Sequence, residues 1–451
     1  MEKLFKLKEN GTNVKREVVG GLITFLTMAY IIAVNANILG DPGVGMNPGA
    51  VVTATCLAAG VTTILMGLYA NLPLGLASGM GLNAFFAYTV VMEMGISWQV
   101  ALTAVFVEGI IFILLSLTKI REAIVNCIPT NLKYAVTAGI GLFIAFIGFG
   151  NAGIVVGSEA TKVTMGSLVS PTALIAILGV IIIVILSKKN VKGAILWGMA
   201  ASAVAAWVYA AISPEAAANF GIYLPEKILK FESVAPIAGK LDFSVFSHPE
   251  AISEFISVVF VFLFIDFFDT AGTLVGVASK IGMIDKEGKV KNAGKALLVD
   301  AIGTTFGALV GTSTVTTYVE SSAGVAAGAR TGLSAVVTGV LFLLAMFLSP
   351  LFVAIPGCAT APALIIVGFF MIESVKNIDF SDFTEGVPAF LTIALMPMTY
   401  SIGDGLMIGM LSYAILNLIA NITTKEAKDR KPVSFVVYIL AIVFLLKIIF
   451  G

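Results

Sequence analysis

The sequence predicts an all-α polytopic membrane protein with about 14 transmembrane segments, arranged as two inverted repeats of seven. The first observation is composition. Of 451 residues, 58% are hydrophobic and 12% are charged, whereas about a quarter of a soluble domain is charged. The second is that the apolar residues form runs of about 20, the length that crosses a bilayer. The third is that a loop of mixed polarity, residues 213–250, divides these runs into two groups.

The expected spans follow from the apolar runs in chain order. The first group lies near residues 18–39, 49–70, 74–93, 97–118, 133–150, 171–187 and 193–212. The second group lies near residues 251–279, 293–310, 314–330, 331–349, 358–373, 386–401 and 403–421, followed by an apolar stretch at 433–450. Pro397 and the Gly403-Asp404-Gly405 sequence are expected to divide 386–421 into two short pieces. The sequence leaves open whether both pieces and the 433–450 stretch cross the membrane.

Basic residues predict the orientation of the chain, because cytoplasmic loops carry an excess of Lys and Arg. The segment 1–17 is polar and basic and is therefore expected in the cytoplasm, with no cleavable signal peptide before the first span. Its basic residues are Lys3, Lys6, Lys8, Lys15 and Arg16. Alternation places the other basic loops on the same side: Lys119 with Arg121, Lys188 with Lys189 and Lys192, Lys280 to Lys295, Lys376, and Lys425 to Lys431. A multi-pass protein of the plasma membrane is expected.

The remaining composition excludes several classes of function. Lys and Arg total 27, as do Asp and Glu, so no net charge favours nucleic acid as a partner. The three cysteines, Cys56, Cys127 and Cys358, are scattered, and His248 is the one histidine. We therefore expect no metal site, no cofactor, no disulfide framework and no enzyme active site. No phosphate-binding P-loop motif occurs, so transport driven by ATP from this chain is not expected.

Two spans are predicted to be interrupted. Residues 71–86 (NLPLGLASGMGLNAFF) are rich in glycine, and residues 311–324 (GTSTVTTYVESSAG) begin with residue types that favour extended backbone. Each predicts a short extended piece followed by a half-helix, as in the binding sites of carriers. The shift that superposes the first four spans of the two groups also places Asn83 on Glu320, at this transition. The alternative is that the glycine-rich span packs closely against a neighbouring helix.

Acidic residues inside apolar spans are functional candidates, because burying a charge in hydrocarbon is costly. Asp266 and Asp269 are three residues apart and are expected on one helical face. Asp300, Glu320 and Glu108 lie in neighbouring spans. Such carboxyl groups repel one another when ionised, so the set predicts a site that binds and releases a proton. The alternative is that a carboxyl group stays protonated and only hydrogen-bonds a neighbouring helix.

Four segments resemble the nucleobase/ascorbate transporter superfamily and, within it, the AzgA-like purine permeases of bacteria and fungi. They are ITFLTMAYIIAVNANIL (23–39), GLASGMGLNAFFAYTV (75–90), FIDFFDTAGTLVGVA (264–278) and DAIGTTFGALVGTSTVTTYVESSAGVAAGARTG (300–332). The resemblance implies a fold similar to that of uracil permease, in which a core domain moves against a gate domain. The implied divisions are a cytoplasmic N-terminus 1–17, a core of 18–118 and 251–349, a gate of 133–212 and 358–451, and an extracellular loop 213–250.

The resemblance also implies roles for individual residues. The essential acid of the eighth span falls on Asp266, the signature of the tenth span begins at Glu320, and the asparagine of the third span falls on Asn83. Further candidates for substrate binding are Ser321, Phe85 and Phe268. Candidates for proton coupling or support of the site are Asp269, Asp300, Thr270 and Glu108. Uracil carriers have a histidine at the place of Thr270, so the resemblance favours purines.

The implied activity is uptake of purine bases by proton symport with alternating access. A carboxylate at Glu320 can accept two donors from a guanine edge, and a protonated Asp266 can donate to a ring nitrogen or to O6. We therefore favour guanine and hypoxanthine as substrates. An adenine-preferring permease is the alternative, followed by uracil, xanthine or an anion on the same fold. Dimers occur in the superfamily, so a homodimer is possible, although no motif indicates one.

Overall fold

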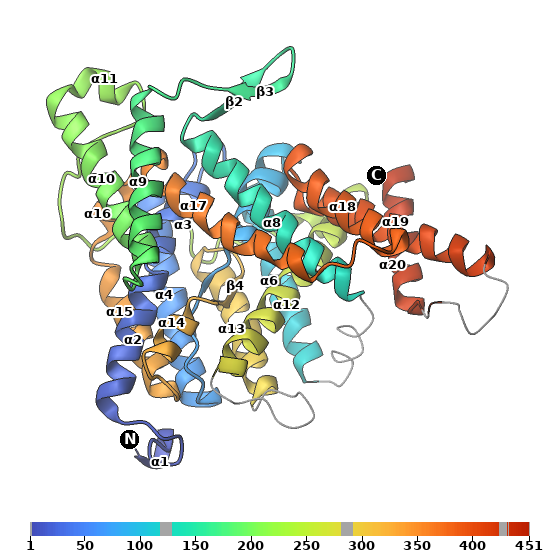
Figure 1. Ribbon diagram of the computed structural model, residues 1–451, viewed down its shortest axis with the longest axis horizontal. Coiled ribbons are helices and arrows are strands. Elements are labelled where there is room, and N and C mark those ends of the chain that lie inside the picture. The colour runs from blue at the N-terminus through green and yellow to red at the C-terminus, as the bar shows by residue number, and fades with distance from the viewer. Residues whose placement is uncertain (1, 118–128, 281–291, 424–430, 432, 451) are drawn as a thin grey trace.

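The helices and strands come from a computed structural model that describes residues 2–117, 129–280, 292–423, 431 and 433–450 (Figure 1). The first half forms α1 (Glu2–Phe5), α2 (Val14–Met28), α3 (Tyr30–Leu39), α4 (Pro48–Leu65), η1 (Met66–Ala70), β1 (Leu76–Ser78), α5 (Met80–Ala84), η2 (Phe85–Glu93), α6 (Trp98–Ser116), α8 (Thr130–Asn151), β2 (Val155–Ser158), β3 (Lys162–Met165), α9 (Pro171–Lys188), α10 (Ala194–Ile212) and α11 (Pro214–Ala218).

The second half begins within the mixed-polarity loop. It forms η3 (Ser244–Ser247), α12 (Pro249–Lys280), α13 (Ala293–Val310), β4 (Val315–Thr317), α14 (Ser321–Ala326), α15 (Gly332–Ala345), α16 (Ser349–Val353), α17 (Gly357–Ile372), η4 (Glu373–Asn377), α18 (Phe383–Met398), α19 (Ile402–Thr423) and α20 (Phe435–Phe450). The described part of the chain is therefore mainly α-helical. Its strands are short pieces of three or four residues.

Nine helices among the described residues are long and apolar enough to cross a membrane. The chain is thus a polytopic membrane protein, as predicted. The number of such helices is lower than the 14 expected spans partly because the third and tenth expected spans are not continuous helices. Residues 76–93 form a strand, a short α-helix and the π-helix η2, and residues 315–326 form a strand and a six-residue helix. The prediction that these two spans are interrupted is confirmed.

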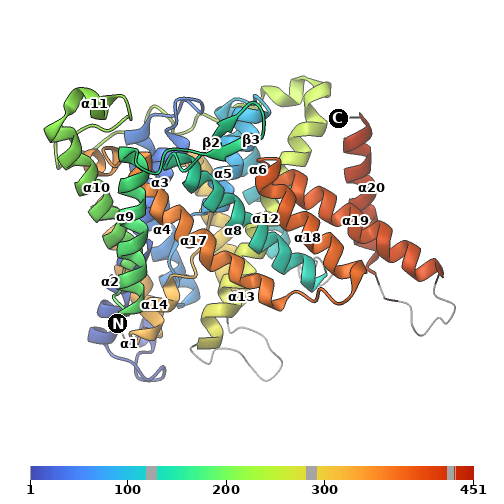
Figure 2. The same ribbon diagram turned by 45° about the horizontal axis from the view of Figure 1, so that its top comes forward.

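The long helices pack in two groups (Figures 1 and 2). In one group α4 contacts α15, α13 and α3, while α6 contacts α13 and α12. In the other group α8 contacts α17 and α18, while α9 contacts α10 and α17. Small residues permit the close crossings, as is usual between membrane helices. For example, a Cβ on Gly368 of α17 would collide with the backbone oxygen of Gly141 on α8.

Two features of the fold differ from the sequence-based expectations. The break between α18 and α19 lies at residues 399–401, where Tyr400 has a φ of 58°. The predicted division of residues 386–421 into two pieces is confirmed, but the break lies between its two expected signals, since Pro397 is in α18 and Gly403-Asp404-Gly405 is in the first turn of α19. The strands β2 and β3 form an antiparallel hairpin between α8 and α9 that the sequence analysis did not predict. Its residues are mostly exposed and alternate too briefly to give a periodic signal.

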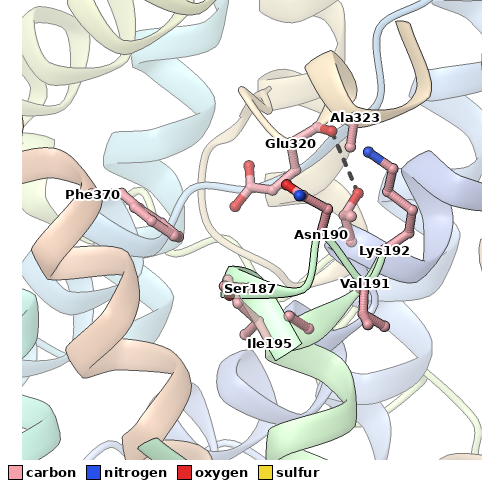
Figure 3. A pocket seen from close by; sticks show the side chains of 11 residues that line it. Ser187, Asn190, Val191, Lys192, Ile195, Glu320, Ala323 and Phe370 are labelled. Atoms are coloured by element: carbon pink, nitrogen blue, oxygen red, sulfur yellow. Dashed lines mark hydrogen bonds between the residues drawn. The ribbon is translucent and has the colours of Figure 1, made fainter. Parts of the chain in front are cut away.

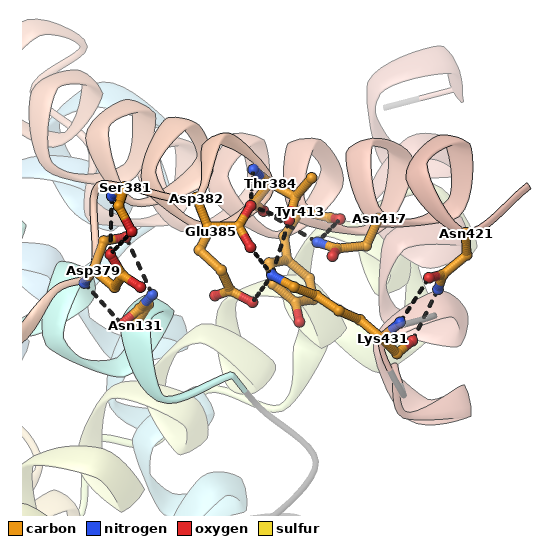
Figure 4. A network of polar contacts seen from close by, with 10 residues as sticks. All are labelled: Asn131, Asp379, Ser381, Asp382, Thr384, Glu385, Tyr413, Asn417, Asn421 and Lys431. Carbon is orange, nitrogen blue, oxygen red and sulfur yellow. Dashed lines mark hydrogen bonds and ion pairs between the residues drawn. The ribbon is translucent and has the colours of Figure 1, made fainter. Parts of the chain in front are cut away.

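A polar network fastens the chain after α19 to the start of α18 (Figure 4). The Lys431 ammonium contacts the Asp382 carboxylate and lies 3.6 Å from Oε1 of Glu385. The backbone N–H of Lys431 donates to Asn421 on α19. The hydrogen bond from Lys431, together with one from Thr384, holds the pKa of Asp382 below its ordinary value. The following helix α20 packs against α12, with the rings of Phe444 and Phe260 5.7 Å apart.

Candidate functional site

The two interrupted spans meet through an antiparallel strand pair. β1 lies against β4, with Leu76 opposite Thr317, Ala77 opposite Thr316 and Ser78 opposite Val315. Both strands are buried. Backbone N–H and C=O groups at a sheet edge are not tolerated in hydrocarbon unless other parts of the protein form hydrogen bonds with them. Here β1 and β4 form part of these hydrogen bonds with each other.

Side chains satisfy more of this backbone. The hydroxyl of Thr63 on α4 accepts from the N–H of Leu76 at 2.9 Å and donates to its carbonyl at 3.0 Å. The hydroxyl of Ser321 accepts from the N–H of Gly75 at 2.9 Å. The hydroxyl of Tyr318 donates to the carbonyl of Ser78. Ser321 therefore holds the two interrupted spans together, and its predicted contact with substrate stays a prediction.

Glu320 stands at the start of the half-helix α14. It is the residue before the first helical residue, Ser321, and the hydroxyl of Tyr30 donates to its Oε1 at 2.6 Å. Tyr30 is the first residue of α3, directly after the turn at Ala29 that separates α3 from α2. No sequence pattern singled out Tyr30. Its hydroxyl within an otherwise apolar run was the available signal.

A cavity of about 250 Å³ lies beside Glu320 (Figure 3). Its walls come from α2, the end of α9, the turn before α10, α14 and α17. The lining residues are Thr27, Ser187, Asn190, Val191, Lys192, Gly193, Ala194, Ile195, Glu320, Ala323 and Phe370. Asn190, Val191 and Lys192 are exposed, so the cavity opens beside the basic turn between α9 and α10. Glu320 is the predicted site residue that lines this cavity.

Three other predicted acids form a buried cluster behind the strand pair. Glu108 on α6, Asp266 on α12 and Asp300 on α13 are all fully buried, and Glu108 is close enough to interact electrostatically with both Asp266 and Asp300. Threonine hydroxyls donate to each of them. Thr314 donates to Glu108 at 3.1 Å, Thr304 to Asp266 at 3.4 Å, and Thr270 to Asp300 at 2.9 Å. The structure thus brings Glu108, Asp266, Asp300 and Thr270 together, away from the lining of the cavity.

The strand β4 connects this acidic cluster with the interrupted spans. The hydroxyls of Thr270 and Thr316 are 2.6 Å apart, and Thr316 lies opposite Ala77 of β1. The hydroxyl of Thr304 also donates to the carbonyl of Val315 at 3.0 Å. A change at the acids can therefore reach the strand pair through direct hydrogen bonds. No group of three or more His, Cys, Asp or Glu in the described part of the chain could hold a metal ion.

The remaining predicted residues lie elsewhere. Asn83 is buried in α5, three residues after its first residue Met80, and accepts from the hydroxyl of Ser313. The predicted match of Asn83 to Glu320 is therefore wrong, because α5 begins directly after Gly79 whereas three residues separate β4 from α14. Phe85 is buried and packs edge-on against Phe262, with ring centres 4.9 Å apart. The side chains of Phe268 and Asp269 lie outside the described part of the structure.

Comparisons with known proteins identify the family. A model described as "Permease family" matches residues 15–408. The guanine/hypoxanthine permease PbuG of Bacillus subtilis is 46% identical, with 99% of this chain and 100% of that protein covered. The adenine permease AdeP of Escherichia coli is 41% identical, with 100% and 96% covered.

Among solved structures, the transmembrane domain of the cyanobacterial bicarbonate transporter BicA has the same fold, with a TM-score of 0.64. It is 15% identical, with 88% of this chain and 97% of that chain covered. The family and the relatives thus identify a membrane permease rather than an enzyme. The chain belongs to the Permease family, and its resemblance to the AzgA-like branch is confirmed.

Proposed function

We propose that this protein is a secondary carrier that takes purine nucleobases across the plasma membrane together with protons, by alternating access. Two relatives of similar identity support the substrate class, since one is named a guanine/hypoxanthine permease and the other an adenine permease. The proposal includes 14 spans in two inverted sevens, a cytoplasmic N-terminus, and a core and a gate domain. The two groups of packed helices support the division into core and gate.

The position of Glu320 is the observation that carries the proposal. Glu320 directly precedes the half-helix α14 of an interrupted span, and it lines a cavity of about 250 Å³. A purine has about ten non-hydrogen atoms and is smaller than the drug-sized ligands that fill pockets of roughly 300–1,000 Å³. A carboxylate can accept two hydrogen bonds side by side, which matches the N1–H and the 2-amino group of guanine. The proposal therefore favours guanine and hypoxanthine, with adenine as the alternative.

The buried cluster supplies the proposed site of the proton. Glu108, Asp266 and Asp300 are fully buried and close together, so a bound proton lowers the repulsion between their charges. Asp266 is not among the residues that line the cavity. We therefore assign it to proton coupling in this conformation, rather than to the predicted contact with the base. Hydrogen bonds link Asp300 to Thr270 and Thr270 to Thr316 of β4, so they connect the cluster to the strand that precedes α14.

Uptake of radiolabelled hypoxanthine in cells without their own purine permeases tests the proposal. Excess unlabelled guanine should block uptake, whereas adenine and uracil should not. Glu320→Gln should abolish uptake or reverse the order of competitors. Glu373→Gln is the matched control, because Glu373 is exposed and pairs with Lys376. Block by adenine alone would make adenine the substrate. Absence of uptake for every purine, with the protein present in the membrane, would overturn the proposal.

A further inference from the structure

The turn that joins α9 to α10 reaches the cavity beside Glu320. α9 ends at Lys188, and Asn190 follows with a φ of 55°. The N–H of Asn190 donates to the carbonyl of Ser187 and the N–H of Val191 donates to that of Leu186, both at 2.9 Å. This pair of bonds is a Schellman motif, in which the left-handed residue is usually glycine and sometimes asparagine. The helix end is thus satisfied by backbone alone, which leaves the Asn190 side chain available.

The carboxamide of Asn190 points into the cavity. Figure 3 shows it directed toward the carboxyl group of Glu320, and both residues line the same cavity. The turn packs directly on α2, because a Cβ on Gly193 would lie 3.0 Å from the carbonyl oxygen of Leu26. A base bound at Glu320 would therefore meet Asn190 across the cavity. Asn190 belongs to the helix group of α9 and α10, whereas Glu320 belongs to the other group.

Resting on the proposed function, we propose that Asn190 is a second hydrogen-bonding residue for the purine, contributed by the α9–α10 turn opposite Glu320. A carboxamide offers two donors and an acceptor, and the rim of a purine carries donors and acceptors side by side. Glu320 belongs to α14 and Asn190 to the α9–α10 turn, so both can hold one base only while these two parts are close together. Asn190 therefore adds affinity in the conformation described here and loses its contact when α14 moves away.

The variant Asn190→Gly separates this role from the role of the residue in the turn. Glycine suits the left-handed position at least as well as asparagine, so the helix end is kept while the carboxamide is removed. Loss of one net hydrogen bond should weaken binding by about three- to tenfold. Asn190→Asp keeps a residue that tolerates this backbone but places a second carboxylate near Glu320, and it should weaken binding of the neutral base by tenfold or more.

Asn292→Gly is the matched control. Asn292 also has a left-handed backbone, with a φ of 62°, and its side chain donates to the carbonyl of Ala70 away from the cavity. Equilibrium binding of radiolabelled guanine, hypoxanthine and adenine to the purified full-length protein in detergent gives Kd for each variant. Size-exclusion profiles report the folded state.

The expected result is a raised Kd for Asn190→Gly and Asn190→Asp, with an unchanged Kd for Asn292→Gly. Wild-type Kd for both Asn190 variants would overturn the role of Asn190 and leave the proposed function standing. A wild-type protein that binds none of the three purines would overturn the proposed function, and this inference with it.

Discussion

The hydroxyl of Tyr30, the first residue of α3, donates a hydrogen bond of 2.6 Å to the Oε1 of Glu320, the residue directly before α14. The bond joins the first span to the interrupted tenth span. It orients the carboxyl group that lines the cavity, since one of its two oxygens is bound to a fixed donor. Figure 3 shows the Glu320 side chain extending into the space between α14 and the α9–α10 turn.

The variant Tyr30→Phe should raise the KM for purine uptake by about tenfold or more, because a hydrogen bond to a carboxylate contributes about 1.5–3 kcal/mol. The protein should fold normally, since the ring is retained. Initial uptake rates over a range of substrate concentrations give KM. Tyr223→Phe is the control, because Tyr223 is 62% exposed in the loop after α11. An unchanged KM for Tyr30→Phe would show that Glu320 needs no positioning.

The variant Glu108→Gln should uncouple substrate movement from the proton. Glu108 interacts with Asp266 and Asp300 in the buried cluster, and glutamine keeps its shape while it cannot carry the proton. Uptake by proteoliposomes should lose its dependence on an inward proton gradient, while exchange of labelled for unlabelled base continues. Glu215→Gln on the exposed helix α11 should behave as wild type. Wild-type dependence on the gradient in Glu108→Gln would remove Glu108 from proton coupling.

The variant Ser321→Ala should lower stability without changing KM. Its hydroxyl accepts from the buried N–H of Gly75, and an unsatisfied buried donor costs about 1–3 kcal/mol. Thermal unfolding in detergent measures the loss as a lower Tm. Ser322→Ala is the control, because Ser322 is the neighbouring residue and is only partly buried. A higher KM with an unchanged Tm would instead support the predicted contact of Ser321 with substrate.

The variant Lys431→Met should lower Tm at neutral pH by an amount that disappears in acid. Lys431 helps to hold the pKa of Asp382 below its ordinary value of about 3.9. Asp382 is therefore ionised and paired at neutral pH, and this stabilisation is lost as the pH falls through the lowered pKa. At about one-third exposure the pair contributes about 1 kcal/mol or less.

The test is Tm measured from pH 7 to pH 3, with Lys376→Met as the control for an exposed pair. An equal difference between wild type and Lys431→Met at every pH would show that the pair with Asp382 does not cause the effect.

Local residue types were enough to predict the interrupted spans. The glycines of residues 71–86 and the Thr- and Val-rich residues of 311–324 disfavour helix over short distances, and β1 and β4 lie in these segments. The membrane class and the candidate acids followed equally directly, because long apolar runs and the charges within them can be seen in the local order of residues. Superposing the spans by a constant shift matched Asn83 to Glu320 incorrectly, because the number of residues between the strand and the half-helix differs in the two halves.

The sequence by itself thus determined the membrane class, the family, the two interrupted spans and the acids within them. Only the tertiary structure decided which polar groups lie together: Glu320 with Tyr30 beside a cavity that Asn190 also lines, and Asp266 with Glu108 behind β4. The physical reason is that an apolar run fixes a helix and its depth in the membrane through local interactions. Contacts between distant spans depend on how helices rotate and pack against one another, and no local pattern in the chain specifies that packing.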